Sequence, residues 1–453
     1  MMTTKTPRND RLALFSFLIS VVFLTFALGW AVGEYKLFPY RIVSLARQGF
    51  AELRTQGLRK GKLSNKSEKA MALYYKKVPL PYPPSHVNTN EAFRGLNLVT
   101  RVAKGLELKT EVMDMDGTLL HVWNIDWFKI WPDATHLPKA FKPKNSPGTH
   151  LHGAVIMENG DLVFNFDHLG LVRLGLRGEV VWRLPYQTHH SVHRQGDGNL
   201  WVCGQKQHDK PDARFPNLIP PFTEHTVLEV TPDGAIANEW SVPELLQENG
   251  YTGLLYIGPF KNDSTKEKGD VLHMNDAEPF PDTMEEAYFK KGDVLVSLRN
   301  INTVFTFNRH TRKITFICTG TFVWQHDPDF IDGNRFSVFD NNKTALSGQK
   351  PQSRIMIVSA PDHKTDLYYQ GSKAAPFYTD IMGKHQWLPN GNLLITEARN
   401  GRAFEINPEG KIVWDYRNIV DQGVVGLVEE VQRVPLDLAR FFNDDQRQTE
   451  AGQ

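Results

Sequence analysis

Excess charge and cysteine are both scarce in this 453-residue sequence. The 52 lysine and arginine residues nearly balance the 51 aspartate and glutamate residues, which leaves a formal net charge of +1. Because proteins that grip nucleic-acid phosphates carry an excess of basic residues, the charge balance gives no support to that class. The two cysteines, Cys203 and Cys318, lie in separate apolar runs. We expect two buried free thiols, since a disulfide would require the two strands to meet.

Long uncharged runs are also rare, with one exception near the N-terminus. Residues 12–33 form 22 consecutive positions without a charge, enough for a helix to cross a hydrocarbon core of about 30 Å. We predict a transmembrane anchor over 12–33, preceded by a short tail, residues 1–11. A cleaved signal peptide is the alternative, although its apolar core usually has about 7–15 residues. Basic residues flank the run on both sides, so charge does not orient the span.

The next segment, residues 34–90, mixes apolar residues at helical spacing with repeated arginine and lysine, and contains the proline-rich run VPLPYPPS. This composition predicts a basic helical stalk at a membrane surface and then a linker. A solvated helix without a lipid role is the alternative. We expect the globular domain over residues 91–430 and a C-terminal tail over 431–453.

Helical periodicity is nearly absent after residue 90. Short runs of Val, Ile, Leu, Phe and Trp alternate with glycine-containing turns roughly every 8–12 residues, as in all-β proteins. A turn followed by a strand that ends near tryptophan occurs four times, as DMDGTLLHVWNI, GLRGEVVWRLP, TPDGAIANEWSVP and NPEGKIVWDYRN. The repeat predicts four-stranded blades and an all-β, six-bladed β-propeller. The expected blades cover about 97–127, 150–186, 189–243, 270–319, 323–372 and 383–416.

Histidine recurs at one place in this pattern. His152, His190, His326 and His385 each stand six to eight residues before the glycine of a turn. If each histidine begins the innermost strand of a blade, the repeat directs several imidazoles into one central channel. The alternative is that each histidine merely suits a crowded strand entry and bonds to a backbone carbonyl.

Four motifs, in this order, carry a family resemblance: THHSVHRQGDGNLWV, VLHMNDAEPF with GDVLVSLRN, WQHDPDFIDGNRFSVFDN, and HQWLPNGNLLITEARNGRAFEINPEGKIVWDY. Together they resemble the arylsulfotransferases of the periplasmic, nucleotide-independent type over about residues 100–430. The resemblance implies a six-bladed propeller that needs no cofactor. It also implies an aryl sulfate donor, a phenolic acceptor and a sulfohistidine intermediate.

The resemblance also assigns residues. It implies that His326 accepts the sulfuryl group, and that Arg299 and His273 bind the sulfuryl oxygens and assist the leaving group. His190 matches the family's His-His-Asp motif, although Ser191 stands where aspartate is usual. An acidic segment, residues 278–291, lengthens the connection between His273 and Arg299 and is expected to reshape the acceptor entrance.

These roles agree with the chemistry of the side chains. Imidazole can attack as a neutral nucleophile and later leave, while a guanidinium stabilises the charge on three sulfuryl oxygens. A histidine that donates and recovers a proton would assist a phenolic leaving group, and His273 and His190 are both candidates. We expect Asn275, His385 and Arg402 to contact substrate, with a surface salt bridge as the alternative for Arg402.

Two other functions stay open on the sequence. Histidines near Asp327 or Asp276 could hold Zn, Mn or Fe in a hydrolase or lyase, but we predict no metal. A propeller can also act without chemistry, as a scaffold or accessory subunit of a membrane complex. Convergence of His190, His273, Arg299 and His326 in one pocket would favour the enzyme, which we expect on the periplasmic or extracytoplasmic side.

Overall fold

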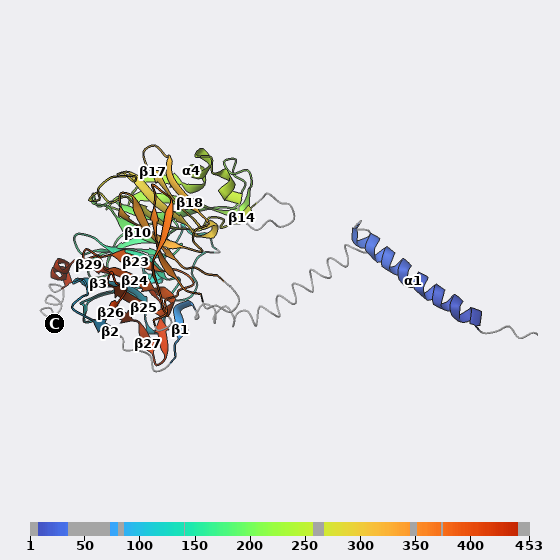
Figure 1. The fold of residues 1–453 in the computed structure, drawn as a ribbon, viewed down its shortest axis with the longest axis horizontal. Coiled ribbons are helices and arrows are strands. Elements are labelled where there is room, and N and C mark those ends of the chain that lie inside the picture. Colours follow the sequence, from blue (N-terminus) through green and yellow to red (C-terminus); the bar gives the residue numbers. More distant parts are fainter. Residues whose placement is uncertain are drawn as a thin grey trace, which may run out of the picture. The chain divides into compact units, whose positions relative to one another are not determined.

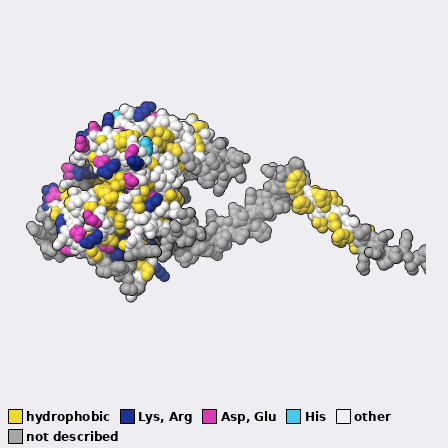
Figure 2. Space-filling model, in the orientation of Figure 1, with side chains coloured by type: hydrophobic (Ala, Val, Ile, Leu, Met, Phe, Trp, Pro, Cys, Tyr) yellow, Lys and Arg dark blue, Asp and Glu magenta, His cyan; other side chains and the backbone are white. Residues whose placement is uncertain are grey.

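The computed structural model describes residues 8–34, 73–79, 86–139, 141–256, 267–344, 351–372 and 375–442. The chain divides into two units, residues 1–72 and residues 73–453. Helix α1 (Arg8–Glu34) is the described element of the first unit, and its side chains between residues 13 and 28 are mostly exposed and hydrophobic (Figure 2). In the part of the chain that the structure describes, no helix is both long enough and apolar enough to span a membrane. The predicted anchor over 12–33 is therefore not supported, and most of the predicted stalk lies outside the described residues.

The second unit is built almost entirely from antiparallel sheets (Figure 1). Its short α-helices are α3 (Trp127–Ile130) and α4 (Val242–Glu248). Helical residues are also described at 73–74 and 439–442. There are also five 3₁₀ turns: η1 (Lys104–Leu106), η2 (Thr252–Tyr256), η3 (Arg299–Ile301), η4 (Ala398–Asn400) and η5 (Leu436–Leu438).

Six sheets of this unit have four or five strands each. From the innermost strand outward, the first sheet consists of β29 (Val428–Val434), β3 (Leu96–Val102), β4 (Leu108–Met113) and β5 (Leu119–Ile125). In the same direction, the second consists of β6 (Leu151–Ile156), β7 (Leu162–Phe166), β8 (Gly170–Leu174) and β9 (Val180–Leu184). The third consists of β10 (Thr188–Arg194), β11 (Leu200–His208), β12 (Leu218–Val230) and β13 (Ile236–Ser241), with β14 (Glu267–Gly269) parallel to β12.

The other three sheets also begin with their innermost strands. The fourth is β15 (Met274–Pro279), β16 (Asp293–Leu298), β17 (Thr303–Asn308) and β18 (Ile314–Thr319). The fifth is β19 (His326–Asp332), β20 (Arg335–Asp340), β21 (Arg354–Ser359) and β22 (Lys364–Gln370). The sixth is β23 (Lys384–Trp387), β24 (Leu393–Glu397), β25 (Arg402–Ile406), β26 (Ile412–Arg417) and β2 (His86–Asn88). A separate small sheet joins β1 (Tyr75–Lys77), β28 (Val424–Gly426) and β27 (Ile419–Asp421).

The innermost strands close a ring. Strands β6, β10, β15, β19, β23 and β29 contact one another in this order, and β29 contacts β6. The first sheet takes its inner strand from the C-terminal part of the chain, so β29 lies beside β3 (Figure 1). This radial arrangement of antiparallel sheets is an all-β, propeller-like fold.

The repeated tryptophans join neighbouring sheets. The indole N–H of Trp123 donates to the Gly175 carbonyl at 2.9 Å, and that of Trp182 donates to the Pro232 carbonyl at 3.0 Å. In each pair the tryptophan lies on the outer strand of one sheet, and its acceptor lies at a hairpin turn of the next. Trp240 and Trp414 make the same contact with Arg309 and Met115. The repeated tryptophan motif of the sequence thus forms a hydrogen bond between each pair of neighbouring sheets concerned.

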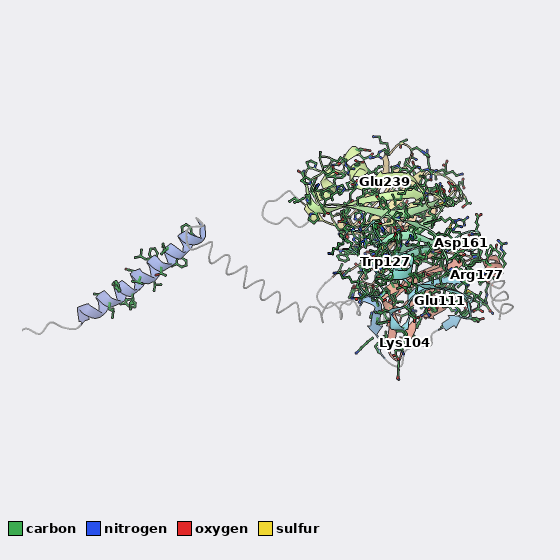
Figure 3. The ribbon with its side chains drawn as sticks, turned by 180° about the vertical axis from the view of Figure 1, so that it is seen from behind. Lys104, Glu111, Trp127, Asp161, Arg177 and Glu239 are labelled. Atoms are coloured by element: carbon green, nitrogen blue, oxygen red, sulfur yellow. The ribbon has the colours of Figure 1, made fainter. Side chains whose placement is uncertain are left out.

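Apolar clusters fill the spaces between adjacent sheets. Trp201 and Trp240 of the third sheet pack with Phe305 and Phe307 of the fourth, and comparable clusters lie between the other neighbours. Trp127 of α3, labelled in Figure 3, is buried with its ring against the edge of Phe166 in β7, 5.1 Å between centroids. Burial of these large side chains is the main stabilising contribution to the sheet interfaces.

The second unit extends beyond the predicted limits of 91–430. Strands β1 and β2 precede residue 91, while β29 continues to Val434 and Phe442 is fully buried. Part of the predicted tail therefore supplies the closing strand. Both cysteines are free as predicted, but only Cys203 is buried, and Cys318 is half-buried.

Candidate active site

The inner strands begin with irregular backbone at their histidines. The pairing register of β10 shifts after His189, and that of β15 shifts after Met274. His190 and His273 adopt left-handed backbone conformations, with φ of 56° and 48°. Non-glycine residues pay a conformational penalty there, and a β-bulge turns a side chain away from its regular alternation. The bulges therefore orient these imidazoles differently from an ordinary strand residue.

Four of the predicted residues come together at this end of the ring. The ring centroids of His190 and His273 are 5.2 Å apart, and those of His190 and His326 are 6.3 Å apart. The Arg299 backbone N–H donates to the His273 carbonyl at 3.0 Å. The Arg299 charge is close enough to lower the pKa of both His273 and His326. We call these four residues, with His152 beside His190 at 4.3 Å between rings, the histidine centre.

The hydrogen bonds of His326 determine which of its ring nitrogens carries the proton. Its Nδ1 lies 2.6 Å from the Oδ1 of Asn341 and 3.1 Å from the Trp324 carbonyl. The Asn341 amide group donates to the Thr379 and Met382 carbonyls, at 3.0 and 2.7 Å, which orients Oδ1 toward His326. Because both partners of Nδ1 are acceptors, Nδ1 carries the hydrogen and Nε2 keeps its lone pair.

Burial and nearby positive groups keep His326 and His190 neutral. Burial lowers the pKa of His326 well below its usual value, and Arg299 lowers it further. Burial also lowers the pKa of His190 far below normal, with His152 and His189 acting in the same direction. The His326 imidazole is therefore neutral at pH 7, and the lone pair on its Nε2 is available for nucleophilic attack.

Residues that the motifs did not assign orient the other histidines. Asp270 lies 2.5 Å from Nδ1 of His273 and 2.8 Å from Nε2 of His225. Burial opposes ionisation of Asp270, but these two imidazoles outweigh it and hold its pKa far below normal. Burial lowers the pKa of His273 to about 4 even though Asp270 favours its charged form. Nδ1 of His273 thus donates to Asp270 and leaves Nε2 free.

His190 is oriented by its neighbour rather than by the residue at the motif's aspartate position. The Nδ1 atoms of His189 and His190 are 2.7 Å apart, so one ring donates to the other. Ser191 instead lies 3.6 Å from the Cys203 sulfur and accepts a bond from the Ala277 N–H.

The remaining predicted residues lie in different surroundings. Asn275 donates to the Gln325 carbonyl at 2.8 Å and so connects β15 with the residue before His326. His385 bonds to Asp327 at 3.0 Å and to the Ser337 hydroxyl at 2.6 Å. Arg402 is buried in an ion pair with Asp415 at 2.7 Å, within the sixth sheet. The structure does not bring His385 or Arg402 into the histidine centre.

A second group of ionisable residues lies further along the same inner strands. We call this group the carboxylate end: Asp276, Glu278, Asp327, Asp329, Lys384 and His385. Several of these residues line a cavity of about 830 Å³, and Lys384 bonds to Asp327 at 2.6 Å. Burial raises the pKa of Glu278 to about 8, while Lys384 and His385 together outweigh burial and hold the pKa of Asp327 down. Positive partners therefore balance part of this buried charge, and protonation neutralises the rest.

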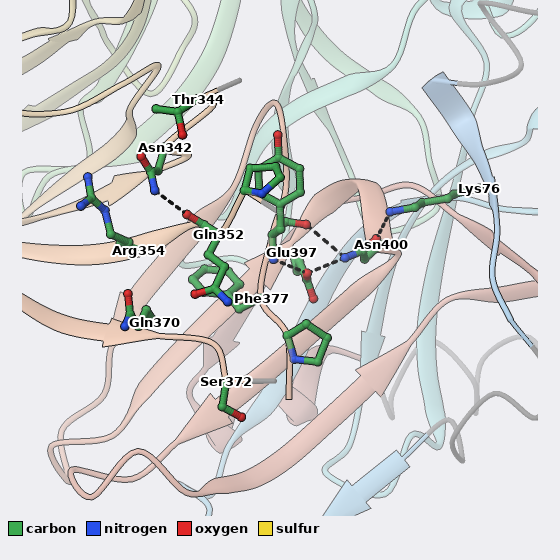
Figure 4. A pocket seen from close by; sticks show the side chains of 13 residues that line it. Lys76, Asn342, Thr344, Gln352, Arg354, Gln370, Ser372, Phe377, Glu397 and Asn400 are labelled. Atoms are coloured by element: carbon green, nitrogen blue, oxygen red, sulfur yellow. Dashed lines mark hydrogen bonds between the residues drawn. The ribbon is translucent and has the colours of Figure 1, made fainter. Parts of the chain in front are cut away.

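Another cavity of about 860 Å³ is formed by the fifth and sixth sheets with Lys76 of β1 (Figure 4). Its wall includes Asn342, Gln352, Phe377 and Glu397, and Asn342 donates to the Gln352 carbonyl at 2.9 Å. None of the predicted site residues lines this cavity. Asn342 of its wall directly follows Asn341, the residue whose side chain orients His326.

Four clusters of histidine and carboxylate groups among the described residues have donor atoms within 4.8 Å of one another. In two of these clusters a positively charged side chain already pairs with the carboxylates. Arg214 pairs with Asp212 and Glu224, and Lys384 pairs with Asp327. The other two share His152 and lie at the histidine centre, where His152 groups with Asp167 and His190, or with His150 and Glu429.

Fold and site together define an all-β, propeller-like protein whose inner strands converge on a cluster of neutral histidines. The model of the family described as arylsulfotransferase (ASST) matches residues 153–419, more than half of the chain. The chain belongs to this family, as the sequence motifs predicted. No curated protein matches the chain.

Solved structures give distant likenesses. A protein of unknown function from Bacteroides caccae is 12% identical over 74% of this chain and 98% of its own, with a TM-score of 0.45. The β-propeller domain of Cps50 (Swd1) from Myceliophteria thermophila is 7% identical over 76% and 89%, with a TM-score of 0.40. The WD40 propeller domain of Doa1 is 11% identical over 79% and 95%, also with a TM-score of 0.40. Likenesses this distant carry no argument about function.

Proposed function

We propose that the protein transfers a sulfuryl group from an aryl sulfate to a phenolic acceptor, through a covalent intermediate on Nε2 of His326. The observation that carries the proposal is the pair of acceptors at His326 Nδ1, the Asn341 oxygen and the Trp324 carbonyl. They keep the hydrogen on Nδ1 and the lone pair on Nε2. Membership of the arylsulfotransferase family supports the same class of reaction.

In the first step, Nε2 of His326 attacks sulfur, the nitrogen–sulfur bond forms, and the bond from sulfur to the aryl oxygen breaks. The aryl group leaves as a phenolate, and the imidazole becomes a sulfated imidazolium that keeps its Nδ1 hydrogen. Asn341 Oδ1 accepts that hydrogen at 2.6 Å, so its bond strengthens as the ring gains positive charge. In the second step the acceptor oxygen attacks sulfur, and the nitrogen–sulfur bond breaks.

Arg299 is the proposed partner of the sulfuryl oxygens. Its guanidinium lies over the Trp324 ring, 4.8 Å from the centroid. Among the described residues, its side-chain hydrogen bonds are two long ones of 3.4 Å to Asn300. A guanidinium with few protein acceptors keeps its N–H groups for an anion, and its charge stabilises the transferring group.

His273 is the proposed acid and base. Its Nδ1 is held by Asp270, and its Nε2 can take the hydroxyl proton of the acceptor in the second step. Its pKa of about 4 keeps it neutral before substrate binds. A bound sulfate ester brings a negative charge, which favours the protonated ring and so helps it to return that proton to a leaving phenolate.

The test is to incubate the purified protein with p-nitrophenyl sulfate, with and without phenol, and to follow nitrophenolate release and the mass of the His326 peptide. We expect phenol-dependent release and one added sulfuryl group on His326. His326→Ala should lose both, while His310→Ala, an exposed histidine outside the centre, should keep both. A folded protein that shows neither release nor adduct with several aryl sulfates would overturn the proposal.

The number of blades, the choice between an enzyme and a scaffold, and the location of the protein belong to the same proposal. We infer that the six four- and five-stranded sheets are six blades, because their inner strands form one ring. The convergence of His190, His273, His326 and Arg299 favours the enzyme over a scaffold. A location outside the cytoplasm is a prediction from the sequence, to be tested by fractionating cells that express the full chain.

A further inference from the structure

His152 of the histidine centre also belongs to a cluster of three residues that has no role in the proposed transfer. His152 lies on β6, His150 immediately precedes that strand, and Glu429 lies on β29. One donor atom from each lies within 4.8 Å of the others, and all three residues are more than nine-tenths buried. The matched family region begins at residue 153 and ends at 419, so all three residues lie outside it.

Glu429 has no partner within the described part of the protein. Both of its carboxylate oxygens are buried, and neither makes a hydrogen bond among the described residues. Asp167 and Glu430 are its charged neighbours and both are acidic. Burial, with the help of these two groups, raises the pKa of Glu429 well above normal. A buried carboxyl without a bonding partner is unfavourable unless another group satisfies it.

Asp167 lies against both imidazoles. Its Oδ2 is 3.5 Å from Nε2 of His150, and its Oδ1 is 3.4 Å from Nδ1 of His152. One nitrogen of each ring therefore faces a carboxylate, which leaves the second nitrogen of each ring for another partner. A carboxylate behind a histidine is the usual support of a metal ligand, because it fixes the ring and its tautomer.

We propose that His150, His152 and Glu429 bind one divalent first-row transition-metal ion, with Asp167 supporting the two imidazoles. Two imidazoles and one carboxylate suit Zn²⁺, Fe²⁺ or Mn²⁺, whereas Ca²⁺ and Mg²⁺ favour oxygen donors. Donor atoms around such an ion lie about 3–4 Å apart, so small side-chain movements bring the three groups into range. Glu429 loses its proton when the ion binds and becomes the charged ligand.

The site lies where the ring of sheets closes. Glu429 belongs to the C-terminal strand β29, while His152 lies on β6 of the next sheet and His150 immediately before it, and the two strands contact each other. A shared ion fastens these strands together. The His152 ring is also 4.3 Å from that of His190, so loss of the ion would disturb one wall of the histidine centre.

The test measures metal content and thermal stability, which do not depend on sulfuryl transfer. Protein purified without chelator is analysed by inductively coupled plasma mass spectrometry. It is then treated with 1,10-phenanthroline, dialysed, and titrated with ZnCl₂, MnCl₂ or CaCl₂. We expect about one transition-metal ion per chain, a fall of about 5 °C in Tm on removal, and recovery with Zn²⁺ but not Ca²⁺.

Glu429→Gln is the informative variant. Glutamine has nearly the shape of glutamate but carries no charge, so it is a much weaker metal ligand. With a metal, Glu429→Gln and His152→Ala should both lower bound metal at least fivefold, while His208→Ala, in another histidine and carboxylate cluster, should keep it. Metal below one-tenth of an ion per chain, with no Tm response to Zn²⁺, would overturn the proposal. The His326 adduct would still report on sulfuryl transfer.

Discussion

The histidine centre and the carboxylate end, which both lie along the inner strands, differ in how their buried ionisable side chains are accommodated. At the histidine centre, His190, His273 and His326 stay neutral because burial and nearby positive charge lower their pKa values. At the carboxylate end, Lys384 balances Asp327, while burial raises the pKa of Glu278 to about 8. The histidine centre holds neutral imidazoles beside the Arg299 guanidinium, whereas the carboxylate end holds the ion pair of Lys384 and Asp327.

This difference indicates a division of work. Neutral imidazoles with a free ring nitrogen can attack, accept a proton or bind a metal. Charges that are already paired mainly hold neighbouring strands together, as Lys384 and Asp327 do for β23 and β19. We therefore expect substitutions at the histidine centre to affect activity and substitutions at the carboxylate end to affect stability.

The largest effect should come from His326→Ala. Removing the nucleophile should lower kcat for aryl sulfate turnover by at least about 10³-fold, or about 4 kcal/mol in the activation barrier. The Tm should change little compared with His310→Ala. Steady-state kinetics and a thermal melt on the same preparation measure both. If kcat fell less than tenfold, His326 would not be the nucleophile.

Lys384→Met should have the opposite profile. The change removes the lysine partner of the buried Asp327 and leaves its carboxylate with His385 alone, which should lower the free energy of unfolding by about 3 kcal/mol. Urea denaturation measures the loss, with Lys364→Met, on the exposed outer strand β22, as the control. An unchanged unfolding midpoint would mean that the charge balance contributes little.

Asn341→Leu should reduce activity less than loss of His326 itself. The variant removes the acceptor that fixes the Nδ1 hydrogen, although the Trp324 carbonyl remains at 3.1 Å. We expect kcat to fall about ten- to a hundredfold with KM within about threefold, because the interaction strengthens in the transition state. A rise in KM with kcat unchanged would place Asn341 in substrate binding instead.

The two regions should also differ in how their stability depends on pH, with opposite signs. The pKa of His273 is lowered to about 4 in the folded protein, so its contribution to stability is lost as pH falls from about 6.5 to 4. The pKa of Glu278 is raised to about 8, so its contribution is lost as pH rises from about 4.5 to 8. Each group changes stability by about 1.4 kcal/mol per pH unit within its own range.

Glu278→Gln isolates one of these contributions. The variant cannot ionise, so the free energy of unfolding should decline less between pH 6 and 8 than in the wild type, with the acid side unaltered. Urea unfolding at several pH values gives both curves. Identical curves for variant and wild type would show that Glu278 titrates normally.

The sequence predicts the scaffold well because its turns and tryptophans are local signals. Trp123 and Trp182 occur at equivalent places in their repeats, and each makes the same bond to the next sheet. It also identified His190, His273, Arg299 and His326, which the fold brings together. The membrane anchor that the apolar run over 12–33 predicted is not supported by the described residues.

The supporting groups of the site were harder to predict. Asn341 follows β20, 15 residues after His326, so its bond depends on the pairing of β19 with β20. Asp270 lies only three residues before His273, but it lies just outside the motif that begins VLHMND and was not assigned. Positive φ at His190 and His273 cannot be seen in the sequence, since histidine gives no glycine-like signal. His385 shares the repeat position of His326 but lies at the carboxylate end, in a strand whose register is regular.

The closing strand β29 has a consequence for the order in which the protein can be made. Strand β3 leaves the ribosome more than 300 residues before its inner partner, β29, is synthesised. Until then the first sheet lacks its inner strand, the ring is open, and Glu429 is absent from the side of His150 and His152. A growing chain therefore exposes the inner edge of β3 through most of translation, and the histidine centre gains its last wall only after synthesis passes Val434.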